Sequence, residues 1–441
     1  MSESQTSTLQ EKAHSHPTHK VQAIVILPAE PMQPPPPPPL QPKAISECSA
    51  ASLMTLAGAW LVQFCTFGYV NAFGVYQDFY TRDFLANKSP SDISWIGSLQ
   101  LFLMYAFGIA VGRAFDGGFF HHLEMGGAVL YVFCVFMLSL AQPGQYYQVF
   151  LAQGVGMGIG LGLTFLPSFS IVSHHFRAHR ALATGIVATG ASAGGIVFPI
   201  MLNHLFRDPR MGFTGGVRAS GGLIAGLLLI ANAMMRTNYA PKASRTKLDW
   251  TALSRFVWDG AYLWSIIGAF LTNLGMFLPF FYFQLYAIDK GISESLAADC
   301  LTILNAGSIA GRLLPTALAD RLGVYNIMLP AMMTSAALLF GMFGIRSGAD
   351  AVVIAAIFGF STGAYISLIP SLLAMLCTDM SELGLRMGLA FSAVAFANLI
   401  GNPIAGQLLG QGNGKSRSLT WWKALVFGGV NSYSQFVDMS H

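Results

Sequence analysis

Three polar residues at helical spacing, inside one long apolar stretch, are the strongest candidates for chemistry in this sequence. Asn305, Ser308 and Arg312 lie between residues 296 and 317, and their spacing places them on one face of a helix. If the stretch spans a membrane, its ionised arginine costs a few kcal/mol or more and should line a polar cavity. A planar guanidinium suits a carboxylate or another planar anion. The stripe therefore predicts an anion site. The alternative is that Arg312 braces its helix end, against Asp320 or the terminal carbonyls.

Side-chain amides supply the other candidate contacts with a solute. Asn273 and Gln284 are eleven residues apart, which puts them on one helical face with Phe277 and Phe280. Such a face suits an aromatic or heterocyclic solute. The alternative is hydrogen bonding between helices, which buried amides in a membrane commonly form. The same two interpretations apply to two further pairs, Gln63 with Asn71 and Asn398 with Asn402.

The acidic residues give a negative prediction. Asp78, Asp116, Asp299, Asp320 and Asp350 all lie at or near the ends of apolar stretches, and no aspartate or glutamate is expected at mid-membrane. Proton symport uses a titratable group that both sides of the membrane can reach. The sequence therefore favours facilitated diffusion, or coupling through a proton that the solute itself carries.

The elements that position these residues follow from composition. The chain is 54% hydrophobic and 10% charged, whereas soluble domains carry about 25% charge. Its apolar runs reach the roughly 20 residues that cross a bilayer, and in lipid each run must be helical. We therefore expect an all-α multi-pass membrane protein with eleven clear spans and a short twelfth one, Trp421–Val430. The predicted spans are 53–76, 95–113, 125–142, 146–173, 181–206, 216–235, 260–287, 296–317, 326–345, 350–376 and 384–410.

Other classes of function find no support in the sequence. The five cysteines are scattered without metal or disulfide spacing, and no serine–histidine pair or nucleotide-binding loop is present. The net charge of +4 reflects membrane topology, so no nucleic-acid partner is expected. We predict a protein that is not an enzyme, has no metal or other cofactor, and has a small solute and the lipid bilayer as partners. Its oligomeric state is left open.

The chain repeats itself at an offset of about 203 residues. The repeated positions are Pro167-Ser168 and Pro370-Ser371, Gly185 and Gly388, Pro199-Ile200 and Pro403-Ile404, and Asp116 and Asp320. Two parallel halves in a membrane are the architecture of a secondary transporter, with the solute path where the halves meet.

The organisation of the chain follows from charge and apolar runs. We expect a disordered tail over 1–50, a first helical half over 51–236, a linker over 237–259 and a second half over 260–441. Lysine and arginine are more frequent on the side of the membrane that includes the tail and the linker, which predicts a cytosolic N-terminus. The plasma membrane is the expected location.

Four segments resemble one known family. They are residues 67–77 (FGYVNAFGVYQ), 93–100 (ISWIGSLQ), 151–154 (LAQG) and 304–315 (LNAGSIAGRLLP). They look like the fungal monocarboxylate-porter branch of the major facilitator superfamily, and the likeness runs from about residue 56 to 410. It implies twelve helices in two halves that rock between inward-open and outward-open states. Members carry monocarboxylates, riboflavin or secondary metabolites.

The resemblance also implies roles and departures. Gly112, Asp116, Asp320, Arg321 and Gly323 look like the superfamily's gating-loop motif, in which an acidic group and an arginine form a latch that breaks as the halves rock. In proton–lactate members a lysine stands near Asn71 and an aspartate at Ser308, so proton-coupled lactate transport is not expected. Gln153, the last candidate solute contact, stands where many members have an arginine.

The expected function is therefore a transporter, whether uniporter, symporter or exporter, that works by alternating access. Its solute would be a monocarboxylate, an aromatic heterocycle or a secondary metabolite. The alternative is a non-transporting sensor or a degenerate paralogue. The altered entry to the first helix at Glu47 and the short twelfth span motivate this alternative.

Overall fold

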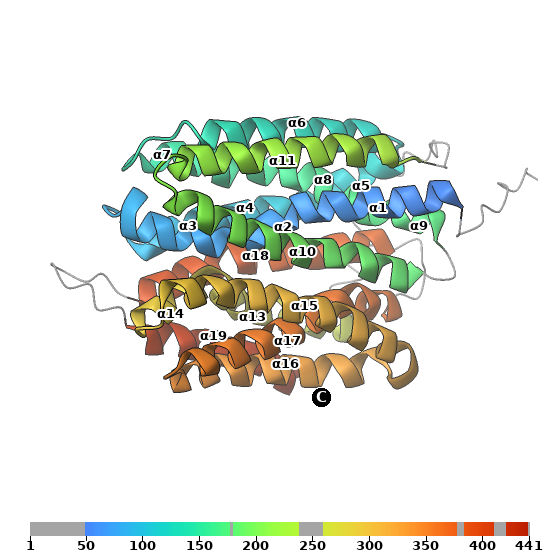
Figure 1. The fold of residues 1–441 in the computed structure, drawn as a ribbon. Coiled ribbons are helices and arrows are strands. Elements are labelled where there is room, and N and C mark those ends of the chain that lie inside the picture. Colours follow the sequence, from blue (N-terminus) through green and yellow to red (C-terminus); the bar gives the residue numbers. More distant parts are fainter. Residues whose placement is uncertain (1–48, 177–179, 238–258, 377–382, 410–419, 440–441) are drawn as a thin grey trace, which may run out of the picture. The chain divides into compact units, whose positions relative to one another are not determined.

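The computed structural model describes residues 49–176, 180–237, 259–376, 383–409 and 420–439, all of which lie within one compact unit, Ile45–His441. Every regular element in these ranges is a helix. The predicted tail, apart from its last two residues, and most of the predicted linker fall outside them. Figure 1 shows the described helices running roughly alongside one another.

The helices form two sets. The first set consists of α1 (Ala50–Cys65), α2 (Phe67–Asn71), α3 (Phe73–Phe79), the π-helix η1 (Tyr80–Phe84), α4 (Pro90–Ala106), α5 (Gly108–Asp116), α6 (Phe120–Leu138), α7 (Tyr146–Val149), the π-helix η2 (Phe150–Met157), α8 (Gly158–Ser170), α9 (Val172–His175), α10 (Arg180–Arg207) and α11 (Gly212–Met234). The second set consists of α13 (Gly260–Met276), α14 (Leu278–Asp289), α15 (Glu294–Leu322), α16 (Val324–Gly341), the 3-10 helix η3 (Met342–Gly344), α17 (Gly348–Met375), α18 (Leu383–Leu408) and α19 (Trp421–Met439).

Local sequence explains where several helices begin and end. Ser89 caps α4: its hydroxyl accepts a hydrogen bond from the backbone of Asp92, the Asp92 side chain bonds back to Ser89, and Pro90 occupies the first turn. At the other end of a long helix, Gly323 closes α15 with a φ of 87°, a conformation that glycine adopts without steric penalty.

Ten helices in the described part of the chain are long and apolar enough to cross a membrane. The long helices α15 and α19, of 29 and 19 residues, are more polar. The prediction that the twelfth span stops at Val430 is wrong, because α19 continues to Met439. Counting apolar residues missed its last two turns, which are polar. At 19 residues the helix is about 28 Å long.

The first span of each set is interrupted at a matching place. α2 gives way to α3 at Ala72, with φ −82° and ψ 0°, and α13 gives way to α14 at Phe277, with φ −82° and ψ −5°. In membrane transporters, solute sites commonly lie beside discontinuous helices.

The predicted repeat has a structural counterpart. Pro199 lies inside α10 and Pro403 inside α18, which are the fifth long spans of their respective sets. Close backbone packing also recurs. A Cβ on Gly194 of α10 would lie 2.2 Å from the carbonyl oxygen of Phe64 in α1, and one on Gly401 of α18 would lie 2.4 Å from that of Leu274 in α13. Only glycine permits these contacts.

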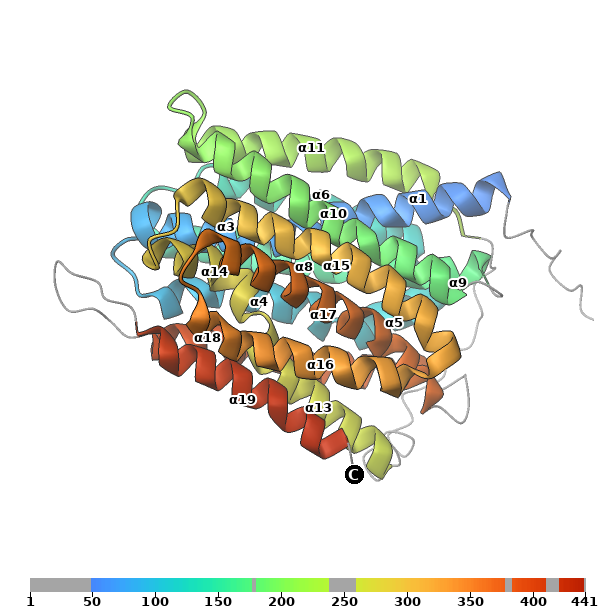
Figure 2. The same cartoon turned by 60° about the horizontal axis from the view of Figure 1, so that its bottom comes forward.

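The helix pairs that join the sets most extensively are α10 with α15, α4 with α18, and α3 with α14; α5 with α18 and α10 with α17 also touch. The end of the molecule at which α1 and α13 begin is called the linker end. The opposite end, at which η1 and α14 end, is called the far end. Figure 2 shows the linker end on its right, where α1 and α13 diverge. At the far end α3 packs on α14, whereas no comparable contact joins the described residues of α1 and α13.

Candidate functional site

The pairing of α10 with α15 gives a scale along the interface between the sets. The helices run antiparallel: Arg207 meets Glu294 at the far end, Ser192 meets Ser308 midway, and the carbonyl of Ala188 meets Arg312 nearer the linker end. The α4–α18 pair is also antiparallel. Its contacts run from Ser91 with Pro403 to Tyr105 with Phe391.

Arg312 lies at this interface and is 2% exposed. Its Nε donates to the hydroxyl of Ser308 at 3.2 Å, and its NH1 donates to the carbonyl of Ala188 in the other set at 3.1 Å. Ser192 donates in turn to Ser308, at 3.2 Å. No carboxylate pairs with Arg312 among the side chains that the structure describes. Asp320, the partner considered above, lies outside these side chains. The predicted Asn305–Ser308–Arg312 stripe therefore holds a buried cation whose described partners are all neutral.

Three of the predicted amides lie near the same interface. Asn71 donates to the carbonyl of Ala191 at 3.4 Å, and Asn305 donates to Leu301 within its own helix at 2.9 Å. Asn398 is 1% exposed, and neither its Oδ1 nor its Nδ2 has a hydrogen-bond partner. These side chains belong to the helices that form the interface between the sets, where the repeat predicts a solute path.

Two other predicted amides hold helices of one set together. Asn273 of α13 donates to the hydroxyl of Tyr365 in α17 at 3.3 Å. Gln153 of η2 accepts a hydrogen bond from Tyr80 at 2.8 Å. Both contacts match the alternative of hydrogen bonding between helices.

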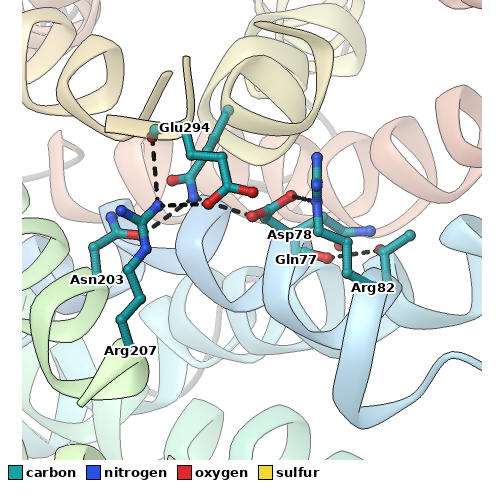
Figure 3. Close-up of polar contacts among 8 residues, drawn as sticks. Gln77, Asp78, Arg82, Asn203, Arg207 and Glu294 are labelled. Carbon is teal, nitrogen blue, oxygen red and sulfur yellow. Dashed lines mark hydrogen bonds and ion pairs between the residues drawn. The ribbon is translucent and has the colours of Figure 1, made fainter. Parts of the chain in front are cut away.

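Gln284 belongs to the far end. Its Nε2 donates to Asp78 of α3 at 3.2 Å and to Asn203 of α10 at 3.2 Å, so one side chain of the second set holds two helices of the first. Arg82 donates to the other carboxylate oxygen of Asp78 at 2.5 Å. Figure 3 shows this polar group, which we call the far-end seal. The shared helical face predicted for Gln284 and Asn273 is divided by the interruption at Phe277.

Aromatic rings and an ion pair flank the far-end seal. The rings of Phe73 and Phe281, from opposite sets, lie 4.6 Å apart, and both are 1% exposed. Arg207 and Glu294 approach to 3.5 Å at the surface, with side chains 49% and 64% exposed. The buried rings exclude water, whereas an ion pair this exposed adds little stability.

The sequence analysis missed two buried acids. It placed Asp78 outside the first span, yet the helix continues to Phe84 and Asp78 is 9% exposed. It started the third span at residue 125, yet α6 begins at Phe120 and Glu124 is fully buried, with neither carboxylate oxygen partnered. Both acids lie within two turns of a span end, so the expectation that acids lie at or near span ends still holds for them, but their burial was not foreseen. The spacing of Asp78 and Arg82, one helical turn, was the available signal.

The predicted gating motif lies at the linker end. Gly112 and Asp116 are in α5, and Asp320, Arg321 and Gly323 are at the end of α15. Arg321 is exposed. The side chains of Asp116 and Asp320 lie outside the described ones, so the latch between them stays a prediction.

Comparison with known proteins now identifies the class. Residues 56–374 match the profile of the Major Facilitator Superfamily, and the chain belongs to this family. It is a multi-pass membrane transporter of small organic solutes, and the alternative of a sensor or degenerate paralogue is not favoured.

Several fungal proteins are similar over most of their length. "MFS-type transporter 1" of Ophiocordyceps sp. (strain BCC 1869) is 37% identical over 84% of this chain and 81% of its own. "Aspyridones efflux protein apdF" of Emericella nidulans is 36% identical over 87% and 77%, and "Agnestins efflux protein AgnL12" of Paecilomyces divaricatus is 36% identical over 82% of each. The xylose transporter XylE from E. coli shares the fold, with a TM-score of 0.68 at 15% identity over 89% of this chain and 98% of XylE.

Proposed function

We propose that this protein exports a planar organic anion, a carboxylate or an acidic heterocycle, by alternating access between the two helix sets. The observation that carries the proposal is Arg312, a buried guanidinium without a described carboxylate partner. A buried cation left uncompensated is costly. A solute carboxylate between the sets would offset that cost and accept hydrogen bonds in the bidentate geometry that arginine favours.

Relatives support the direction and the kind of solute. Two similar proteins are named as efflux proteins, for aspyridones and for agnestins. We therefore infer that the solute is a secondary metabolite leaving the cell, and that the chain falls in the monocarboxylate-porter-like branch. Asn71, Asn305, Ser308 and Asn398 are proposed as further solute contacts.

Orientation follows from the charge bias of the sequence. With a cytosolic N-terminus in the plasma membrane, the linker end faces the cytosol and the far-end seal faces outward. The solute would enter between α1 and α13, and it would leave after the far-end seal breaks. The motif formed by Gly112, Asp116, Asp320, Arg321 and Gly323 would latch the linker end during release.

The direct test is transport by the full-length protein in reconstituted vesicles, with radiolabelled aromatic carboxylates as probes. Arg312→Ala should lower the transport rate at least about tenfold, because one charge-assisted hydrogen bond contributes roughly 1.5–3 kcal/mol. Arg312→Lys should retain part of the rate. Arg218→Ala is the matched control, because Arg218 is an exposed arginine on α11 whose Nε donates to Ser139. Wild-type rates in Arg312→Ala for every carboxylate would remove the anion assignment.

A further inference from the structure

Four hydrogen-bonding atoms at the interface of the two sets are buried and unpartnered. They are Oδ1 and Nδ2 of Asn398, Oδ1 of Asn305 and Nε2 of Gln100. The three side chains are between 0% and 1% exposed. Buried polar groups are nearly always paired, so a cluster of exceptions calls for an explanation.

The contacts between helices place these amides at one level of the membrane. Tyr105 of α4 meets Phe391 of α18 across this antiparallel pair. Gln100 precedes Tyr105 by five residues and Asn398 follows Phe391 by seven, so both amides lie between one and two helical turns nearer the far end than these rings. On the other side of the interface, Asn305 lies against Gly195, where an added Cβ would be 2.3 Å from its Oδ1.

Asn71 completes this level from a third direction. It belongs to α2, which ends at the interruption before α3, and it reaches the carbonyl of Ala191, one turn from Gly195 along α10. We call Asn71, Gln100, Asn305 and Asn398 the amide layer. Two of its members come from each set, so the layer lies between the parts that must separate.

The amide layer lies at a defined distance from the buried cation. Asn305 precedes Arg312 by seven residues on α15, which corresponds to about 10 Å of helix. Asn398 follows Phe391 by the same interval on α18. The Phe391 ring stacks on Tyr105 of the other set, with ring centres 5.8 Å apart and planes 7° apart. The cation and the pair of aromatic rings thus lie at a similar depth, each about two helical turns nearer the linker end than the amides.

We propose that the amide layer is a second binding subsite, which hydrogen-bonds a carbonyl, hydroxyl or amide group of the solute. This inference rests on the proposed function, because it takes the other end of the solute to be the anion that Arg312 binds. Asn398 offers one free donor and one free acceptor, and this pair matches a primary amide, a lactam or a hydroxy-ketone. The solute is therefore an elongated aromatic anion whose neutral polar group is about two helical turns from its charge.

A purely structural role explains the layer less well. Each amide seen to bridge helices uses at least one of its atoms to do so. Asn273 bonds to Tyr365 and Gln153 to Tyr80, and Gln63 and Gln284 bond through Nε2 while their Oε1 stays unpaired. Asn398 has both amide atoms free although it is as deeply buried as these. Binding of a polar group of the solute would give these atoms the hydrogen-bond partners that the protein does not supply.

The test compares two probes with the same biphenyl core, biphenyl-4-carboxylate and 4′-carbamoylbiphenyl-4-carboxylate, which differ only in the terminal amide. Their affinities for the purified full-length protein are measured by isothermal titration calorimetry. The wild type should bind the carbamoyl compound about tenfold more tightly, because it satisfies two buried atoms that otherwise stay unpaired. Asn398→Leu should bring this ratio close to one, because the amide group of the probe then loses both partners that distinguish it from the parent compound.

The controls separate this inference from the proposed function. Asn431→Leu removes an amide on α19 that bonds only within its own helix, and it should keep the full ratio. Asn398→Ser, a smaller change, should give an intermediate ratio and covers the case in which the leucine variant does not fold. Arg312→Ala should weaken both probes equally. If Arg312→Ala leaves the affinity for both probes unchanged, the assignment of Arg312 as the anion site is refuted, whereas the assignment of the amide layer is unaffected. A ratio near one in the wild type, or an unchanged ratio in both Asn398 variants, would overturn the amide layer.

Discussion

The two ends of the interface between the helix sets differ in how they are closed. At the far end α3 packs on α14, Phe73 faces Phe281, and Gln284 ties the second set to the first through Asp78 and Asn203. At the linker end the corresponding segments α1 and α13 lack such a contact in the described part of the chain, and they diverge in Figure 2.

This difference shows what must change during a transport cycle. The far-end seal uses a few side-chain hydrogen bonds over a pair of aromatic rings, and the net contribution of one such hydrogen bond is roughly 0.5–1.5 kcal/mol. A seal of that strength is stable yet reversible. The protein in this structure has its far end closed, and the next conformation requires these contacts to break.

The largest effect on the difference between the two ends is expected from a substitution that prevents the close approach of α3 and α14. A Cβ on Gly74 would lie 2.5 Å from the carbonyl oxygen of Phe280, so Gly74→Val should hold the far end open and lower transport at least about tenfold, since such overpacking costs about 1–3 kcal/mol. Reaction of an introduced Ser91→Cys with a membrane-impermeant thiol reagent measures this opening. Gly226→Val, where nothing lies within 4 Å, is the control. Equal labelling in the two variants would contradict the prediction.

A milder change removes only the polar bridge. Gln284→Leu deletes both hydrogen bonds to the first set and leaves the Asp78 carboxylate with Arg82 alone. We expect labelling of the Ser91→Cys reporter to become about five- to tenfold faster, because roughly 1–1.4 kcal/mol of net hydrogen bonding is lost. Gln153→Leu removes an amide of similar burial whose bond stays within one set, and it should leave labelling unchanged. The prediction fails if both variants label alike.

The smallest effect is expected at the exposed ion pair. Arg207→Gln removes the contact with Glu294, and since pairs this exposed contribute about 0–1 kcal/mol, far-end labelling should change less than about fivefold. The residual effect should vanish at high salt, where surface charges are screened. A change as large as that of Gln284→Leu would show that the surface pair, and not the buried bridge, holds the far end closed.

Sequence patterns predicted the architecture well and the contacts poorly. Apolar runs and the repeat gave the helical class and the correspondence of Pro199 with Pro403. The spacing of Ser308 and Arg312 gave a contact that the structure confirms, because such a pair is local to one helix. The ends of spans were less accurate. Asp78 and Glu124 were left outside their helices, since apolar windows end where a polar residue begins even if that residue is buried.

Contacts between segments far apart in the chain could not be read from one sequence. Asn273 and Gln284 have the spacing of a shared face, but the interruption at Phe277 divides their helix. One amide bonds within the second set and the other reaches the first. The amide layer was equally hidden. Gln100 gave no signal of its own, and its relation to Asn398 depends on the register of two helices almost 300 residues apart.

The interruptions at Ala72 and Phe277 have a consequence for the membrane that houses the protein. Each separates the segment that closes the far end from the segment that diverges at the linker end, so the latter is free to swing inward while α3 and α14 remain together. We infer that the cycle passes through a state shut on both sides. Such a state denies inorganic ions a continuous aqueous path, and the cell would keep its membrane potential while the cargo crosses.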